Sequence, residues 1–256
     1  AEPAEVLTSR MERPPLKVLA TSAGCNFFYE TMINQGFRIK ELHSIEIDPD
    51  CRATADSFIP KSVLKHIAPH NVNKVPEWVK KTHYDLHINT SNCQPFSRLQ
   101  DNPLGFKDSR AKAMVSAAAL HRELKKVNPN ILVFVENVIP HRKLVDVDRE
   151  WEQMWEVPFF PIDAQHLGSA CARPRMIGTN FAGPETLRRI LPVPQWWLID
   201  DDALPTKPVM PCVVASQKTK NPPTLTTSKG TTRRLTPDEN DKFMGYMHSR
   251  YQQGER

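Results

Sequence analysis

Four residues of this sequence have side chains suited to covalent catalysis, and they lie in three short segments. They are Cys93, Glu136, Arg173 and Arg175. A cysteine thiolate is a nucleophile that forms reversible covalent intermediates. A carboxyl group that keeps or shares a proton acts as an acid, and a guanidinium holds a carbonyl oxygen or stabilises a nearby thiolate. Together these residue types predict a site for nucleophilic catalysis.

Each of these residues also has a purely structural interpretation. A cysteine in a loop is often only a small side chain, a glutamate after a strand is often a surface acid, and two arginines are often ordinary surface charges. The segments SNCQPFS (91–97) and ENV (136–138) each follow a predicted strand. Parallel sheets bind ligands at the carboxyl ends of their strands, so this placement favours function.

The elements that would position these residues follow from the hydrophobic pattern of the first half. Predicted strands cover 16–20, 41–47, 62–67, 84–89 and 131–135, and predicted helices cover 26–36, 49–58 and 109–126. Asp48 and Pro49 form a typical helix start, and Gly36 a typical helix end. The apolar run ILVFV at 131–135 predicts a strand buried on both faces. This alternation predicts an α/β fold with a doubly wound, mostly parallel sheet.

The domain organisation is predicted from changes in composition along the chain. Prolines become frequent and regular alternation is lost after about residue 181. We expect the chain to have four parts. A flexible leader at 1–15 precedes a catalytic domain at 16–180. A small irregular lobe follows at 181–223, and the chain returns to the catalytic domain at 224–256.

Composition limits the class of protein. The chain is 39% hydrophobic and 25% charged, which is ordinary for a globular protein, and no run of eighteen apolar residues predicts a membrane span. Five scattered cysteines without a CxxC pair argue against a disulfide framework and against a metal site. A net charge of +5 permits a nucleic-acid partner. We therefore expect a reducing compartment, the nucleus or the cytoplasm.

The order of four segments resembles the DNA cytosine-C5 methyltransferase family. The segments SAGCNFFYETM (22–32) and IEIDP (45–49) precede the cysteine and glutamate segments, and the resemblance runs from about Lys17 to about Tyr246. The stretch IDAQHLGSACARPRMIGTN (162–180) is also similar to its counterpart in the vertebrate de novo methyltransferases. The resemblance implies a Rossmann-like methyltransferase fold in which the irregular lobe recognises the target.

The resemblance also implies a reaction and a partner. The methyl donor would be S-adenosylmethionine and the substrate would be cytosine in double-stranded DNA. Cys93 would add to C6 of a base that has left the duplex, which makes C5 nucleophilic. Glu136 would hydrogen-bond N3, and Arg173 or Arg175 would hold the base carbonyl. Asn137 would order the loop.

The resemblance further implies a cofactor site. Its residues would be Ser22, Ala23, Gly24, Cys25, Phe27, Glu46, Ile47, Asn71 and Val72. Glu46 would bind the ribose hydroxyls, Ile47 would pack on the adenine, and Asn71 would accept a hydrogen bond from the adenine amine.

Several positions depart from the family pattern. The first loop usually reads Phe-x-Gly-x-Gly, but here Ser22 replaces the aromatic residue and Asn26 the second glycine. Proline usually precedes the cysteine, where this chain has Asn92, and glycines are usual at Asn89 and Thr90. A Gly-Asn-Ser-Val-like ending is also missing. We expect a partner chain or a C-terminal continuation to complete the cofactor pocket.

The basic stretch 218–234 is the predicted DNA contact. It carries Lys218, Lys220, Lys229, Arg233 and Arg234. Such residues suit phosphate contacts, which position DNA without reading its sequence. The alternative for this stretch is a solvated basic loop.

Two other functions stay open at this point. The altered first loop and the missing ending favour a methyltransferase-like scaffold or regulatory subunit with weak or lost activity. An RNA cytosine-C5 methyltransferase on the same fold is the second alternative, because no motif excludes it.

Overall fold

The computed structural model describes residues 14–164, 171–183, 203–205, 210–211, 224–227 and 231–234. The chain divides into two compact units, one of Ala1–Phe159 with Gly178–Phe181 and one of Phe160–Ile177 with Ala182–Arg256. Within the described part, no helix is long and apolar enough to cross a membrane.

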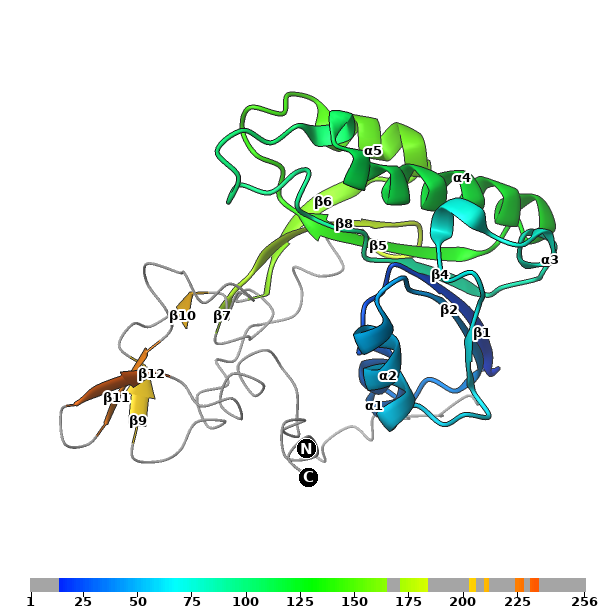
Figure 1. Ribbon diagram of the computed structural model, residues 1–256, viewed down its shortest axis with the longest axis horizontal. Coiled ribbons are helices and arrows are strands. Elements are labelled where there is room, and N and C mark those ends of the chain that lie inside the picture. Colours follow the sequence, from blue (N-terminus) through cyan, green and yellow to red (C-terminus); the bar gives the residue numbers. More distant parts are fainter. Residues whose placement is uncertain are drawn as a thin grey trace, which may run out of the picture. The chain divides into compact units, whose positions relative to one another are not determined.

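A seven-stranded sheet organises the fold (Figure 1). Its strands, in spatial order, are β3 (Leu64–His66), β2 (Ile39–Ile45), β1 (Leu16–Thr21), β4 (Leu86–Asn89), β5 (Leu132–Val138), β8 (Pro174–Thr179) and β6 (Phe159–Asp163). The pairs β2–β3, β1–β2, β1–β4 and β4–β5 are parallel. The predicted mostly parallel α/β sheet is therefore confirmed.

Helices cover both faces of this sheet. Figure 1 shows α1 (Phe28–Asn34) and α2 (Pro49–Phe58) on one face, and α3 (Glu77–Lys80), α4 (Lys112–Val127) and α5 (Val147–Trp155) on the other. Within residues 14–164, the connections contain the 3₁₀ turns η1 (Val72–Lys74), η2 (Gly105–Lys107) and η3 (Ser109–Ala111). The sheet is thus doubly wound, as the alternation of strands and helices predicts.

The start of α2 follows its local sequence signal. The Asp48 carboxylate accepts hydrogen bonds from the backbone N–H groups of Asp50 and Cys51, and Pro49 occupies the first helical position. An aspartate at this position satisfies donors that have no partner within the helix. The predicted bounds of 49–58 are confirmed.

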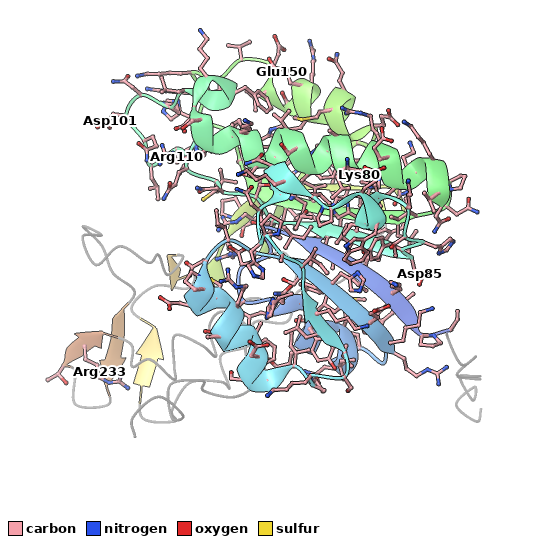
Figure 2. All side chains as sticks on the ribbon, turned by 45° about the vertical axis from the view of Figure 1, so that its right-hand side comes forward. Lys80, Asp85, Asp101, Arg110, Glu150 and Arg233 are labelled. Carbon is pink, nitrogen blue, oxygen red and sulfur yellow. The ribbon has the colours of Figure 1, made fainter. Side chains whose placement is uncertain are left out.

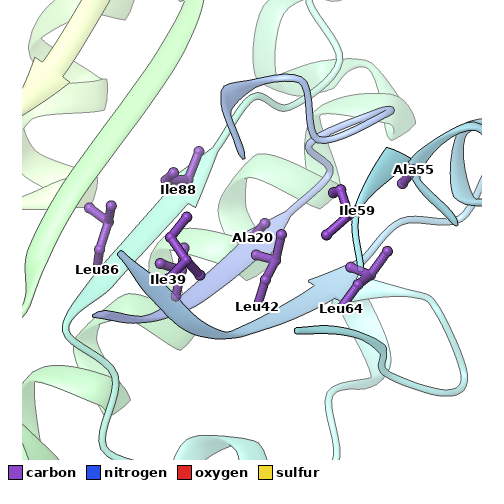
Figure 3. Packing of buried hydrophobic residues seen from close by; sticks show 9 residues of the cluster. Ala20, Ile39, Leu42, Ala55, Ile59, Leu64, Leu86 and Ile88 are labelled. Atoms are coloured by element: carbon purple, nitrogen blue, oxygen red, sulfur yellow. The ribbon is translucent and has the colours of Figure 1, made fainter. Parts of the chain in front are cut away.

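An apolar core lies beneath α1 and α2 (Figure 3). Its buried members are Val18, Ala20, Ile39, Leu42, Ala55, Ile59, Leu64, Leu86 and Ile88. Those of β1 and β4 occupy alternate positions, since side chains of a strand alternate between the two faces, and the others come from β2, β3 and α2 with the residue that follows it. This cluster fixes the four N-terminal strands against the two helices.

The opposite face buries aromatic and imidazole rings. His87 of β4 stacks on His121 of α4 with ring centroids 5.4 Å apart, and both lie within 6 Å of Trp155. The Nδ1 atoms of the two histidines are 3.3 Å apart, and His87 Nε2 is 2.9 Å from Thr21 Oγ1. The polar atoms of His87 are therefore partnered although the ring is fully buried.

The structure corrects the prediction for 131–135. The strand β5 begins at Leu132 and continues to Val138, so Glu136 and Asn137 are its last residues rather than part of a following loop. Its burial alternates, and Leu132 is 37% exposed. An apolar run identifies a strand but does not show how far its neighbours extend.

The second unit carries short strands. They are β7 (Cys171–Ala172), β9 (Ala203–Pro205), β10 (Met210–Pro211), β11 (Thr224–Thr227) and β12 (Thr232–Arg234). The order β12–β11–β9 forms an antiparallel sheet, and β10 pairs with β7. Most of the predicted leader (1–15), of the lobe (181–223) and of 224–256 lies outside the described residues.

Candidate active site

Cys93 is exposed at the tip of the loop that follows β4. The Cys93 carbonyl accepts the Phe96 N–H at 3.0 Å, and the Asn92 side chain accepts the Gln94 N–H at 3.2 Å. These two hydrogen bonds fold 92–96 into a tight turn. Asn92 thus closes a turn at the position where the family has proline.

Phe96 anchors this turn. Its ring is fully buried and contacts Trp151 and Phe106 edge to face, with centroids 5.1 and 5.2 Å apart. Such aromatic pairs are favourable beyond the area that they bury. The spacing Cys-Gln-x-Phe therefore places one residue in the core and leaves the thiol three residues earlier at the surface.

Gln94 connects the turn to a charged neighbour. Its side-chain oxygen accepts a hydrogen bond from Arg110 at 2.6 Å, and Arg110 also pairs with Asp108. Figure 2 labels Arg110 and Asp101 on the segment between β4 and α4. The Arg110 guanidinium lowers the pKa of the Asp108 carboxyl to about 2. Asp108 therefore stays ionised at neutral pH and fixes Arg110 next to the turn.

Glu136 lies near the end of β5, at the same edge of the sheet from which the cysteine loop extends. The parallel register pairs Asn89 with Val135, so the end of β4 lies beside the residue that precedes Glu136. The buried Asn137 side chain donates to the Ser91 carbonyl at 3.1 Å. One hydrogen bond therefore ties the neighbour of Glu136 to a residue two positions before Cys93.

The loop after β1 adopts an unusual backbone. Ser22, Gly24 and Asn26 have φ values of 51°, 54° and 58°, in the left-handed region. Glycine and asparagine tolerate this region best. The Asn26 amide also donates to Ser44 Oγ at 3.1 Å. Asn26 therefore adopts, without being glycine, a conformation that glycine favours.

Glu46 closes this loop from the end of β2. Its carboxylate is 7% exposed and accepts the Gly24 N–H and the Asp48 N–H, one on each oxygen, both at 2.9 Å. A carboxylate oxygen has two acceptor positions. One position on each oxygen therefore remains for a ligand hydroxyl.

Open space and an apolar surface lie next to Glu46. A Cβ added at Gly24 would meet no heavy atom within 4 Å. The following residue, Ile47, is 68% exposed, which is unusual for so apolar a side chain. This combination of a spare carboxylate acceptor, an open backbone and an apolar surface fits the ribose and adenine of a nucleoside cofactor.

The other predicted cofactor residues have structural partners. Asn71 caps η1 by accepting the Asn73 N–H at 2.9 Å, and Val72 is buried. Phe27 is half-buried and packs on Phe58 with ring centroids 5.6 Å apart. Ala23 is half-buried against the apolar core. Asn71 keeps one acceptor position for a further hydrogen bond.

The cysteines differ in reactivity. Burial, together with a hydrogen bond to the Cys25 thiol, raises the pKa of Cys51 to about 12. A thiol of such high pKa is almost never present as the thiolate that acts as nucleophile. Cys25 and Cys51 are both half-buried, whereas Cys93 is exposed. Among these three cysteines, Cys93 is therefore the one suited to attack a substrate.

The two predicted catalytic arginines belong to the second unit. Arg175 lies in β8, and Arg173 immediately precedes that strand. The Arg173 N–H donates to Asp163 at 2.8 Å, and the Arg175 guanidinium donates to the Pro174 carbonyl at 2.8 Å. Both side chains are half-buried.

Of the predicted DNA contacts, only the strand β12 is described. Arg233 is half-buried there and is labelled in Figure 2. Its neighbour Arg234 pairs with Thr224 of β11. Lys218, Lys220 and Lys229 lie outside the described residues.

Comparison of the sequence with models of known protein families and with curated protein sequences finds no match. Solved structures do match the fold. The Entamoeba histolytica methyltransferase EhMeth is 13% identical, with a TM-score of 0.63 over 91% of this chain and 87% of that one. The S. pombe Dnmt2 methyltransferase is 14% identical, with a TM-score of 0.57 over 92% of this chain and 87% of that one.

A putative DNA modification methyltransferase from an E. coli prophage is 19% identical over 64% of this chain, with a TM-score of 0.48. This chain spans 46% of the length of that protein. At such low identities the similarity concerns the fold. The chain has a Rossmann-like α/β fold that is similar to the fold of these methyltransferases.

Proposed function

We propose that this chain transfers a methyl group from S-adenosylmethionine to C5 of cytosine in double-stranded DNA. The observation that carries the proposal is the hydrogen bond from Asn137 to the Ser91 carbonyl, which joins the cysteine loop to the end of β5. It brings the nucleophile Cys93 and the acid Glu136 to the same edge of the sheet. The cofactor residues Gly24 and Glu46 follow neighbouring strands at that edge.

The cofactor would bind at the loop after β1. The spare acceptors of Glu46 would take the two ribose hydroxyls, and the exposed Ile47 would pack on the adenine. Asn71 would accept a hydrogen bond from the adenine amine. When bound, S-adenosylmethionine supplies the electrophilic methyl group that C5 of the base accepts.

The residues of the chain would carry the remaining chemistry. The Cys93 thiolate adds to C6 of a flipped-out cytosine, which places electron density on C5. Glu136 donates a hydrogen bond to N3 and stabilises the charge that develops on the ring. Arg173 or Arg175 holds the base carbonyl. Loss of the C5 proton after transfer lets the Cys93–C6 bond break and restores the free thiolate.

The DNA would be positioned by charge. We assign phosphate contacts to Arg233, Arg234 and the lysines at 218, 220 and 229, and target recognition to the lobe at 181–223. Phosphate contacts weaken steeply as salt rises. Replacing Arg233 and Arg234 by Ala should therefore flatten the salt dependence of DNA binding.

A covalent trap tests the proposal. Duplex DNA that contains 5-fluorocytosine cannot lose a proton from C5, so the Cys93 adduct accumulates and survives denaturing electrophoresis. We expect this complex with wild-type protein and cofactor, and none with Cys93→Ser. Glu136→Gln should slow its formation, whereas Glu123→Gln, an exposed glutamate of α4 that pairs with Lys126, should not.

The same trap separates the alternatives. A complex with RNA of the same sequence and none with DNA would point to an RNA methyltransferase. DNA binding without any trapped complex would point to a scaffold. A complex that persists in Cys93→Ser would overturn the assignment of the nucleophile.

Cofactor binding is tested by calorimetry. One hydrogen bond to a charged acceptor contributes about 1.5–3 kcal/mol, or about 10- to 150-fold in affinity. We expect Glu46→Ala to weaken binding by at least that factor, because it also releases the Gly24 and Asp48 N–H groups. The exposed Glu77→Ala serves as the control. Equal affinity in both variants would place the pocket elsewhere.

A further inference from the structure

A buried amide joins the strand β1 to the cysteine loop. Asn89, the last residue of β4, is fully buried, and its amide nitrogen donates to the Thr21 carbonyl at 3.1 Å and to Thr21 Oγ1 at 2.9 Å. Thr21 is the last residue of β1 and is also fully buried. A buried amide without partners is costly, so these two bonds hold the ends of both strands together.

The other side of the Asn89 amide reaches toward Cys93. Its oxygen accepts the Ser91 hydroxyl at 2.7 Å and the Ser91 N–H at 3.3 Å. Both amide hydrogens and both oxygen acceptor positions are therefore used. The amide has one orientation only, since the reverse orientation would place its NH₂ group against the Ser91 N–H.

A second link comes from the next residue. The Thr90 hydroxyl donates to the Ser22 carbonyl at 2.9 Å. Ser22 begins the left-handed loop in which Gly24 donates to Glu46, and its own N–H donates to the Ile45 carbonyl at 2.9 Å. Two hydrogen bonds, joined by the backbone from Ser22 to Gly24, thus connect Glu46 to Thr90, which lies just before the cysteine segment.

Glycine at the positions of Asn89 and Thr90, as the family pattern has it, could make neither side-chain link. A Gly-Gly segment has no side chain to bond and a flexible backbone. In this chain the two residues add three hydrogen bonds across to β1 and its loop. The cysteine loop is therefore tied to the cofactor loop instead of being free to move by itself.

We propose that Asn89 and Thr90 are positioning residues that couple the order of the cofactor loop (22–26) to the placement of Cys93. This inference rests on the proposed function, because it takes the loop at 22–26 to be the cofactor loop. A ligand that fixes Gly24 and Glu46 also fixes the Ser22 carbonyl, and through Thr90 it restricts the cysteine loop. The coupling is reciprocal. The free energy by which a bound ligand restrains the cysteine loop equals the free energy by which a restrained cysteine loop favours ligand binding.

The test measures alkylation of Cys93 by iodoacetamide, with and without S-adenosylhomocysteine, by peptide mass spectrometry. In the wild type, bound ligand should slow Cys93 alkylation, since a tethered loop samples fewer open conformations. Thr90→Val has nearly the same shape but lacks the hydroxyl, and a hydrogen bond of this kind contributes about fivefold to an equilibrium. The ligand effect should therefore shrink by about that factor in Thr90→Val and return in Thr90→Ser.

Two further measurements keep the outcomes distinct. Thr82→Val removes a similar hydroxyl-to-carbonyl bond, to Trp78 at 2.8 Å, in the segment before β4, whereas Thr90 follows that strand. It should keep the wild-type ligand effect even if it lowers the melting temperature. Calorimetry on each variant should show the ligand bound with an affinity within about fivefold of wild type.

The outcomes separate the two proposals. If the ligand binds but Thr90→Val keeps the full ligand effect on Cys93, the coupling is wrong and the proposed function stands. If the ligand binds and the wild type shows no effect, the coupling is also wrong. If the wild type does not bind the ligand at all, the proposed function is overturned, and the loop at 22–26 is not a cofactor loop for Thr90 to act on.

Discussion

The two faces of the sheet differ in the side chains that they bury. The face under α1 and α2 is a continuous apolar cluster that includes Val18, Leu42 and Ile88. The face under α4 and α5 buries His87 and Asn89 from β4 instead. In β4 the two kinds of side chain alternate, with Ile88 on the first face and its neighbours His87 and Asn89 on the second.

The two faces therefore contribute differently to stability and to the orientation of side chains. Apolar contacts are non-directional, so the first face stabilises the sheet without fixing the orientation of any one side chain. Hydrogen bonds between buried polar groups have defined geometry, and a lost partner is costly. The second face therefore fixes the ends of β1 and β4, from which the candidate site loops begin, and makes that part of the molecule sensitive to protonation.

The largest expected effect comes from the apolar face. Leu42 is fully buried in its centre. Leu42→Ala should lower the free energy of unfolding by about 2–5 kcal/mol, through lost burial and the cavity that remains. Urea unfolding measures this loss.

Leu99→Ala provides the matched control. Leu99 is 81% exposed in the segment after the cysteine turn, so the same truncation should change stability by no more than about 0.5 kcal/mol. Similar losses in the two variants would show that the cluster is not the stabilising core of the sheet.

The apolar face is also the part that sequence predicts best. Local signals determine its elements, because Asp48 and Pro49 start α2, a short apolar run marks β1, and apolar residues at alternate positions mark β4. The helix α5 was not predicted, although Trp151 and Trp155 are spaced by one helical turn. The residues that flank it, Asp146 and Glu156, both have left-handed backbones, and no side chain caps its start.

The candidate site was predictable only in part. Its parallel strands place Cys93 and Glu136 at one edge, which the order of segments predicts. The role of Asn26 was not predictable, because a left-handed φ is a property of the folded backbone rather than of the motif. Apart from Ser91, the partners of Asn89 and His87 lie 34 to 68 residues away in the sequence. Only the polar residues at alternate positions of an apolar strand hint at them.

The second prediction concerns packing on the face under α5. Gly178 of β8 is buried, and a Cβ there would overlap the ring of Phe159. That ring packs on Trp151 with centroids 5.6 Å apart and has little room to move. Gly178→Ala should therefore destabilise the protein by about 1–3 kcal/mol.

Gly183→Ala is the control for this variant, because a Cβ at Gly183 would meet nothing within 4 Å. Thermal unfolding of the two variants measures the difference. Equal melting temperatures would mean that the Phe159 ring yields freely, and that this face is packed more loosely than the rings suggest.

The smallest effect on the free energy of unfolding, counted for each residue, should come from protonation of the buried histidines at low pH. Burial lowers the pKa of His121 to about 4, and burial together with His121 holds the pKa of His87 well below its usual value. An unfolded histidine has a pKa of about 6.5. Between these values the unfolded chain binds more protons than the folded one, so stability falls as pH falls below about 6.5. From pH 6.5 to 5.5 each histidine should cost about 1 kcal/mol.

Burial also lowers the pKa of His43 and of His70, so these two histidines add to the same loss. The carboxylates with lowered pKa, Glu41 and Asp108 at about 2, stay ionised throughout this range and add nothing to the loss.

The Nδ1 atoms of His87 and His121 are 3.3 Å apart, so only one of them carries a hydrogen in the neutral pair, and protonating both would set two N–H groups against each other. His121→Phe keeps a ring against Trp155 and removes one titrating group. The loss of unfolding free energy between pH 6.5 and 5.5 should therefore shrink by the contribution of one histidine, about 1 kcal/mol. His83→Gln, a change at a histidine whose side chain is 62% exposed, should leave the loss unchanged. An undiminished loss in His121→Phe would trace the pH dependence to other groups and remove the distinction between the two faces in their response to acid.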